Sequence, residues 1–437
     1  MPDYKSPGVY VEEVPSAVKP IAGVGTSTAG FIGTVPNEFQ IPEANPEYDP
    51  TKPTNPTPEP RPRRPRGDTP AEPTAAAAVG STSEAGNTNQ PFKLTPQPDT
   101  LAPALEPRLC TTFSDFTRQF GGFSQDPGQR FLAHAVYGFF HNGGTRCWVV
   151  RVTSNADIDK ALQSFEPIDE IALVAAPGMV DKNVREAITA HCSEKTQDRF
   201  AILDSLEKVD PINDSMLPPR SDYAAFYFPW IQVFDPATKV QDPNGNGLIY
   251  IPPSGHIAGI YARVDTQRGV HKAPANEVVL GALGVKSKIS KNLQDGLNPS
   301  GVNCIRDING NIRVWGARTI GGDANLEWKY VNVRRLFLFL RESIDEGTQW
   351  VVFEPNDRQL WAKIIRNVTA FLTNVWRDGA LFGDTPREAF YVKCDDETNP
   401  RESRDLGRVV AEIGVAVVRP AEFVIFKISQ WAGPQLK

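Results

Sequence analysis

The chain has 437 residues, which is more than one hydrophobic core usually serves, so we expect two or three domains. Its formal net charge of −6 is spread over that length and its Lys and Arg residues are scattered, which argues against a nucleic-acid partner. Five separated cysteines without a CxxC pair indicate a reducing compartment. No apolar run approaches membrane-spanning length and residues 1–14 lack the pattern of a secretory signal, so we expect cytoplasmic synthesis and no membrane insertion.

The N-terminal segment begins with a short apolar strand. Residues 9–14 lie between two prolines and are mostly β-branched or aromatic, which predicts a strand too short to be stable alone. The following AGVGTSTAGFIGTV contains Gly23-x-Gly25, a weak phosphate-loop signal, because Thr28 stands where a third glycine is needed and no GKS/T follows. We favour close packing between strands for this segment.

A proline-rich stretch follows. Residues 36–73 contain twelve prolines with RPRRPR near the centre, and a polar run continues to about residue 90. This composition predicts an extended, polyproline-like or disordered insertion, with order resuming near Phe92. The basic hexamer could be an address for an acidic surface, but a solvated loop is the simpler interpretation.

The next segment alternates predicted helices and strands, as an α/β domain does. Apolar residues recur on one helical face over residues 131–140, and Asn142 to Gly144 then end the helix. Short apolar strands follow, separated by one further helix. The predicted elements are strands 147–152 and 171–176, helix 183–192, and strands 199–204 and 223–233. Alternating strands and helices imply βαβ units and a mainly parallel sheet.

Two long stretches between Pro252 and Thr319 are rich in Gly and Pro yet contain large apolar residues such as Ile257 and Tyr261. At this density Gly and Pro argue against a regular helix, and the apolar side chains argue against a linker in water. We therefore expect ordered loops. Loops this long usually serve chemistry or contact with another chain.

The last quarter is expected to be α+β. The predicted elements are helix 331–344, strand 350–353, helix 357–376, and strands 390–393, 413–418 and 423–428. Helix 357–376 carries a broad apolar stripe, so we expect this side of the helix to pack against the core of the domain.

Several motifs of this chain resemble, in wording and order, those of the contractile tail sheath family, the outer tubes of contractile phages and of related extracellular injection particles. The matching segments are Phe139–Val152, Pro252–Gly255, Ala258–Asp265, Gly269–Asn276, Asn298–Arg306 and Val314–Thr319. The resemblance covers nearly all of the chain outside the proline-rich insertion. It implies an α/β fold (α+β overall) with a central subtilisin-like domain that lacks catalytic residues, and a C-terminal α+β domain with terminal strand arms.

This resemblance and the composition together suggest five segments. They are an N-terminal arm (1–20), a central domain (21–35 and 92–325), a flexible insertion (36–91), a C-terminal domain (326–420) and a C-terminal arm (421–437).

A subtilisin-like fold requires a test for serine-protease chemistry. Asp204 lies at a strand end, and Ser254 and His256 share a loop, but no histidine or GTS-type turn stands in the order that a subtilase needs. His134 and His141 are two helical turns apart, roughly 10 Å, which is too far for one zinc ion. We therefore expect no catalytic, cofactor or metal site, and without a Walker A motif no nucleotide hydrolysis.

The two terminal strands are candidates for contact between subunits. Burying three or four large apolar residues contributes roughly 5–10 kcal/mol, about what ordering six residues costs, so each arm should order only against an existing sheet edge. In the sheath family such arms cross to neighbouring subunits. The predicted arm residues are Val9, Tyr10, Val11, Val14, Phe423, Val424, Ile425, Phe426 and Ile428. The regions around Pro15–Pro20 and Pro420 are candidate hinges.

The resemblance implies hexameric rings stacked helically around an inner tube, metastable when extended and able to contract. The implied partners are the chain itself, the tube protein, and baseplate and tail-terminator or cap proteins. Such a subunit becomes part of a phage tail or phage-tail-like particle, released by lysis or anchored at a membrane through other components. Residues that could face the tube lie on helix 357–376 and just after it: Arg358, Lys363, Arg366 and Arg377.

Two alternatives stay open from the sequence. A non-polymerising binding module of a phage-like particle would keep the fold but remain monomeric. A subtilisin-like hydrolase would show turnover, for which no set of residues argues.

Overall fold

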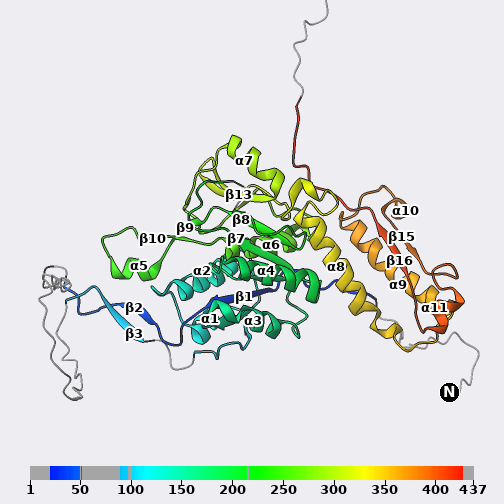
Figure 1. Cartoon of the computed structure of the whole chain (residues 1–437), viewed down its shortest axis with the longest axis horizontal. Coiled ribbons are helices and arrows are strands. Elements are labelled where there is room, and N and C mark those ends of the chain that lie inside the picture. The colour runs from blue at the N-terminus through cyan, green and yellow to red at the C-terminus, as the bar shows by residue number, and fades with distance from the viewer. Residues whose placement is uncertain (1–19, 50, 52–88, 97–100, 214–215, 427–437) are drawn as a thin grey trace, which may run out of the picture.

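The computed structural model describes residues 20–49, 51, 89–96, 101–213 and 216–426 (Figure 1). Its larger, central part is built on one nine-stranded sheet with the order β11-β14-β13-β8-β7-β6-β1-β5-β4. The six strands from β5 to β13 in this order pair in parallel, and antiparallel strands lie at both edges. The predicted mainly parallel sheet is therefore confirmed. Its strands are β1 (Ala29–Thr34), β4 (Arg108–Cys110), β5 (Cys147–Val152), β6 (Leu173–Ala175), β7 (Phe200–Asp204), β8 (Ala224–Phe228), β11 (Glu277–Val278), β13 (Val302–Ile308) and β14 (Asn311–Val314).

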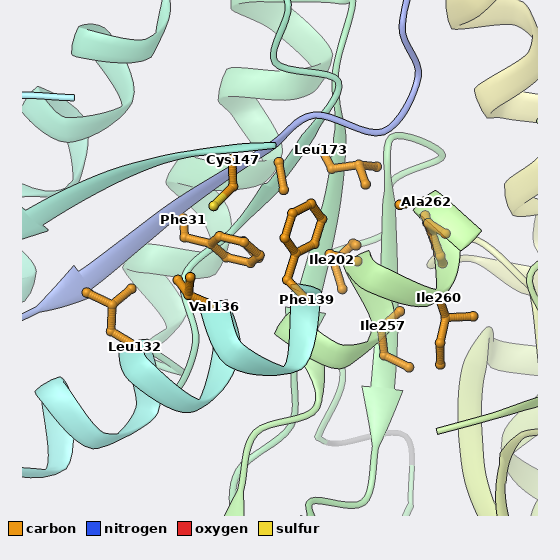
Figure 2. Close-up of a cluster of buried hydrophobic side chains, with 14 of the residues drawn as sticks. Phe31, Leu132, Val136, Phe139, Cys147, Leu173, Ile202, Ile257, Ile260 and Ala262 are labelled. Carbon is orange, nitrogen blue, oxygen red and sulfur yellow. The ribbon is translucent and has the colours of Figure 1, made fainter. Parts of the chain in front are cut away.

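Helices cover both faces of this sheet. The helices of the central part are α1 (Phe113–Phe120), α2 (Pro127–His141), α3 (Ile158–Phe165), α4 (Lys182–Ala190), α5 (Pro236–Gln241), α6 (Ser254–Arg268) and α7 (Lys291–Leu297). Along β1, Phe31 packs into the cluster that contains α2 and α6, whereas Ile32 packs into the cluster that contains α3 and α4. Figure 2 shows the first cluster, with Phe139 beside Phe31. The strands are buried on both faces, as expected of a parallel sheet.

The expectation of loops between Pro252 and Thr319 is wrong for most of that region. Its first stretch forms α6, a buried helix, and its second forms β13 and β14. The glycines of α6 serve packing: a Cβ on Gly255 or Gly259 would come closer than 3.0 Å to the backbone of α2. Glycine at these positions lets the two helices approach closely, which outweighs its cost of about 1 kcal/mol in a helix.

The predicted strand 223–233 is two strands. β8 ends at Phe228, and after Pro229 the chain continues as β9 (Ile231–Phe234). β9 belongs to another sheet, between β10 (Leu248–Ile251) and β12 (Gly284–Val285). Proline lacks the N–H that a central strand must donate, so Pro229 separates the two strands.

A hairpin extends from the central domain (Figure 1). It pairs β2 (Gln40–Ala44) with β3 (Phe92–Pro96) in antiparallel fashion. The prediction that order resumes near Phe92 is confirmed. The stretch expected to be a flexible insertion begins instead with an ordered strand at β2, because β3 supplies hydrogen bonds to it. Residues 52–88 lie outside the described residues.

The C-terminal domain packs two long helices against a small sheet. Its elements are α8 (Val331–Thr348), α9 (Arg358–Arg377), α10 (Pro386–Ala389), α11 (Arg401–Asp405), β15 (Phe390–Lys393) and β16 (Glu412–Val415). Both long helices match their predictions, and the Asp357 side chain caps α9 by accepting hydrogen bonds from Gln359 N and Leu360 N. No helix among the described residues combines the length and apolar character that a membrane span requires.

Two C-terminal strand predictions are corrected. Residues 350–353 are no strand but a 3-10 turn, Gln349–Val351, followed by a loop. Phe353 has a φ of 68°, which is incompatible with extended backbone. The predicted strand 423–428 is also absent over Phe423–Phe426, because this exposed segment pairs with no strand in the described part of the chain. Strand 413–418 is present as β16, with Val417 forming a separate bridge to Leu381.

Candidate functional site

The sheet brings together two of the residues tested for protease chemistry. β7 ends at Asp204, whose carboxylate meets the start of α6. The backbone N–H of Ser254 donates to Asp204 Oδ1 at 2.9 Å, and its hydroxyl donates to Oδ2 at 2.6 Å. Burial raises the pKa of Asp204 to about 7, more than these hydrogen bonds lower it. This pair therefore acts as a buried cap at the helix N-terminus, where a carboxylate is favoured.

His256 does not complete a catalytic set. It lies two residues after Ser254, about 200° further around α6, and packs against Gly138 of α2. Burial, and then the charges of His134 and His141, lower the pKa of His256 to about 3. The ring therefore stays neutral near pH 7 but is a weak base, and it projects from a different side of α6 than the Ser254 hydroxyl. The structure separates the histidine from the serine that the sequence places beside it.

Two further histidines, His134 and His141, are also held by neighbouring side chains. His134 Nε2 lies 3.1 Å from Asp235 Oδ1, and both side chains are buried. Asp235 also caps α5 by accepting a hydrogen bond from the backbone N–H of Thr238 at 3.0 Å. His141 stacks on Tyr137. Among the residues that the structure describes, no three His, Cys, Asp or Glu side chains are placed to hold a metal ion.

A surface hollow lies between α8 and the segments that precede β1, β6 and β7. Its polar lining is mainly acidic, comprising Asp169, Glu170, Asp198, Glu342 and Glu346. The one arginine in its lining, Arg335, is already paired with Asp265, to which it donates two hydrogen bonds of 2.9 and 2.6 Å. Burial and nearby carboxylates raise the pKa of Glu342. The lining contains no histidine, cysteine or serine, and its one hydroxyl, that of Thr26, donates to Asp265, the carboxylate already paired with Arg335.

The predicted arm residues at the C-terminal end are strongly exposed. Phe423, Val424, Ile425 and Phe426 have between 68% and 84% of their surface exposed, and the chain there leads away from the body (Figure 1). Val9, Tyr10, Val11, Val14 and Ile428 lie outside the described residues. The sheet of the same domain has only β15 and β16, with no further strand paired to it in the described part of the chain. Unpaired sheet edges and an exposed apolar segment are the two halves of a strand-addition contact.

The predicted tube-facing cations fall into two groups. At 100° per residue, Lys363, Arg366 and Arg377 project within about 60° of one another, opposite the buried stripe of α9. Arg358 lies about 80° away from the nearest of them and pairs with Asp396 at 2.7 Å. No carboxylate among the described residues pairs with the other three. The structure thus brings three of the four cations to one face.

Sequence analysis missed a charged cluster that joins Arg318 to Glu422. Arg318 lies between β14 and α8, and Glu422 directly precedes the exposed tail. The two residues are 104 positions apart, and the two hydrogen bonds between them are both 2.8 Å long. Arg318 belongs to the quoted Val314–Thr319 motif, but nothing in that motif indicates its partner.

Two protein-family models match most of the chain. The family model of the phage tail sheath protein central domain matches residues 152–320, and that of the phage tail sheath C-terminal domain matches residues 323–430. The tail sheath protein of Burkholderia phage BcepMu is 27% identical over 215 residues, which are 47% of this chain and 42% of that protein. The chain spans about half the length, or less, of the curated relatives it matches.

Solved structures agree over nearly the whole chain. A chain of the contracted helical sheath of the anti-feeding prophage is 25% identical with a TM-score of 0.68, and the match covers 98% of this chain and 99% of that one. A chain of the six-fold symmetrised baseplate of the same particle is 25% identical with a TM-score of 0.67, at the same coverage.

The fold and its open C-terminal surfaces thus define a structural α/β protein of the kind found in contractile particles. The chain belongs to the phage tail sheath protein family.

Proposed function

We propose that the chain is a structural subunit of a contractile tail sheath. It polymerises into hexameric rings stacked helically around an inner tube, and the assembled sheath contracts from a metastable extended state to drive that tube through a target envelope. The observation that carries this proposal is the exposed Phe423–Phe426 segment in a domain whose two-stranded sheet has unpaired edges. Each half of this contact supplies what the other lacks, so two copies of the chain can complete each other.

In this mechanism the chain stores energy by conformation rather than by chemistry. Subunits rotate as rigid bodies during contraction, while the arms keep them linked. The chain has no catalytic activity of its own. The Asp204–Ser254 pair, which is buried away from solvent and has no histidine bonded to the serine, supports this part of the proposal.

The proposed partners are further copies of the chain, an inner tube protein, and baseplate and cap proteins. The similarity to chains of a helical sheath and of a baseplate supports the first and third of these. The subunit is made in the bacterial cytoplasm and leaves within a particle by lysis, or stays anchored through other components. The cationic face of α9, with Lys363, Arg366 and Arg377, is the proposed contact to the tube.

Removal of the arms tests the proposal. Variants that lack Met1–Val14 or Phe423–Lys437 should remain soluble and folded by circular dichroism but should form no sheath in electron micrographs. The full chain is the control and should polymerise. Long sheaths from either truncation would refute the role of that arm.

A non-polymerising binding module makes the opposite prediction for the full chain. Light scattering would then give a monomer at every concentration, and the truncations would change nothing.

A further inference from the structure

The chain returns to the central domain before it ends. After β16, Phe382 N–H donates to the carbonyl of Ala416 at 2.7 Å, so this part of the chain still runs within the C-terminal domain. It then crosses to the region before α8, where Glu422 is bound, and leaves the body directly afterwards (Figure 1). The arm therefore departs from the junction of the two domains rather than from the small sheet.

Glu422 is held by three side chains that approach it from separate segments. Arg318 Nε and Nη2 donate to its two carboxylate oxygens, each at 2.8 Å. Asn298 Nδ2 donates to Oε1 and the Tyr330 hydroxyl donates to Oε2, both at 2.9 Å. Lys329 Nζ lies 3.8 Å from Oε2. A carboxylate bound in this bidentate way has a defined orientation as well as a defined position.

Arg318 is itself fixed in the central domain. Its side chain is 2% exposed, and its Nη1 donates to the Asn298 carbonyl at 2.8 Å and to Asp323 at 3.2 Å. Its backbone N–H and carbonyl are both bound by the buried side chain of Asn303, at 2.7 and 2.8 Å. The guanidinium thus has little freedom to follow a moving partner, and a pull on Glu422 acts on β13, which contains Asn303.

The fixed part of the chain and its exposed tail meet at the peptide bond between Glu422 and Phe423. Glu422 is fixed, whereas the next residue, Phe423, is 69% exposed, and Val424 to Phe426 are exposed as well. Burial acts to raise the pKa of Glu422, but the hydrogen bonds from Arg318, Asn298 and Tyr330 outweigh it and lower the pKa. The carboxylate is therefore ionised, and the ion pair formed, throughout the neutral range.

We propose that the Arg318–Glu422 ion pair is the anchor from which the C-terminal arm leaves the subunit. The pivot of the arm then lies after Glu422 and not at Pro420, where the sequence placed it. Because the anchor is in the central domain, force carried by the arm reaches that domain directly. The last statement depends on the proposed sheath function, whereas the existence of the anchor does not.

Spin labels on either side of Glu422 test the anchor in the full chain. The native cysteines are all buried, so a nitroxide can be attached at Ala421→Cys or, in a second variant, at Val424→Cys. We expect an immobilised spectrum at position 421 and a mobile one at position 424. Adding Glu422→Gln, which keeps the shape but removes the charge, should abolish the immobilised component at position 421. Asp396→Asn, which breaks the exposed pair with Arg358, is the matched control and should leave it unchanged.

Assembly of the same variants tests whether the anchor matters to the particle. We expect Glu422→Gln to give fewer and shorter sheaths in electron micrographs, with normal circular dichroism. An immobilised label at position 421 in the Glu422→Gln background, or a mobile one in the parent chain, would overturn the anchor. A released label with sheaths of normal length would overturn its role in force transfer. If the parent chain forms no sheath at all, the proposed function fails, while the spin labels still decide the anchor.

Discussion

The central and C-terminal domains differ in how completely each buries its apolar surface. Among the described residues, seven large hydrophobic side chains are exposed before residue 326, and eleven are exposed after residue 325. The second segment is well under half as long as the first. Single exposed apolar residues are normal, but such a concentration is typical of a surface that binds another chain. The central domain thus buries most of its large apolar side chains by itself, whereas the C-terminal domain leaves a group of them exposed that the proposed assembly would cover.

The largest predicted effect concerns the contact between α2 and α6. Gly255→Ala places a Cβ into the backbone of Ala135 and should lower the free energy of unfolding by about 3–5 kcal/mol. Urea denaturation measures this change. Gly296→Ala is the control, because a Cβ added at this position in α7 would meet no atom within 4 Å outside the adjoining backbone, and it should stabilise by about 0.5–1 kcal/mol. Equal effects of the two substitutions would show that α6 does not pack as described.

The next effect is a pH dependence at the buried cap. Because the pKa of Asp204 is raised from 3.8 to about 7 by folding, its contribution to stability is lost as the pH rises from about 4 to 7. Asp204→Asn cannot ionise, so its stability relative to the parent chain should increase over that range by roughly 4 kcal/mol. Thermal unfolding at several pH values measures the difference.

Ser254→Ala provides the matching control for this cap. It removes a hydrogen bond that lowers the pKa of Asp204, so the decrease in stability should extend to higher pH. A pH profile identical for the parent chain and Asp204→Asn would contradict the buried, titrating carboxyl.

A smaller effect on the monomer is expected at the cationic face of α9. Replacing both Arg366 and Arg377 by Glu should change the free energy of unfolding by at most about 0.5 kcal/mol, because both side chains are exposed. Co-sedimentation with the tube protein should nevertheless fall. Arg358→Glu is the control, since Arg358 points away from this face. Unchanged sedimentation of the double variant would remove α9 from the tube contact.

The smallest effect on the monomer should come from the tail. Replacing Phe423 and Phe426 by Ser should leave the unfolding transition of the isolated chain unchanged, because neither side chain is buried there. Sheath yield should fall sharply, since the proposed apolar contact of these side chains with a neighbouring subunit would be lost. A clear loss of monomer stability would mean that the tail packs on its own domain.

Local pattern was sufficient for several elements. The helices α2 and α9 follow from apolar residues at helical spacing, and the strands β5 and β7 from short apolar runs. The same reasoning failed for α6, where Gly255 and Gly259 looked like turn residues. These glycines are needed because the backbone of α2 packs closely against them. α2 begins more than a hundred residues earlier, so local helix propensity contains no information about this contact. Phe353 was misassigned for a similar reason, since it pairs with no strand among those that the structure describes.

The candidate site divides in the same way. Sequence motifs alone were enough to indicate the family, and the apolar ends of the chain alone suggested the arms. That Ser254 caps a helix through Asp204, and that Glu422 binds Arg318, became evident from the fold. These partners are 50 and 104 residues apart, and short-range periodicity carries no information about contacts over such separations. Such long-range pairs are formed when sheets and helices pack together. The residues that anchor the arm can therefore be identified from the tertiary structure but not from any single segment of the sequence.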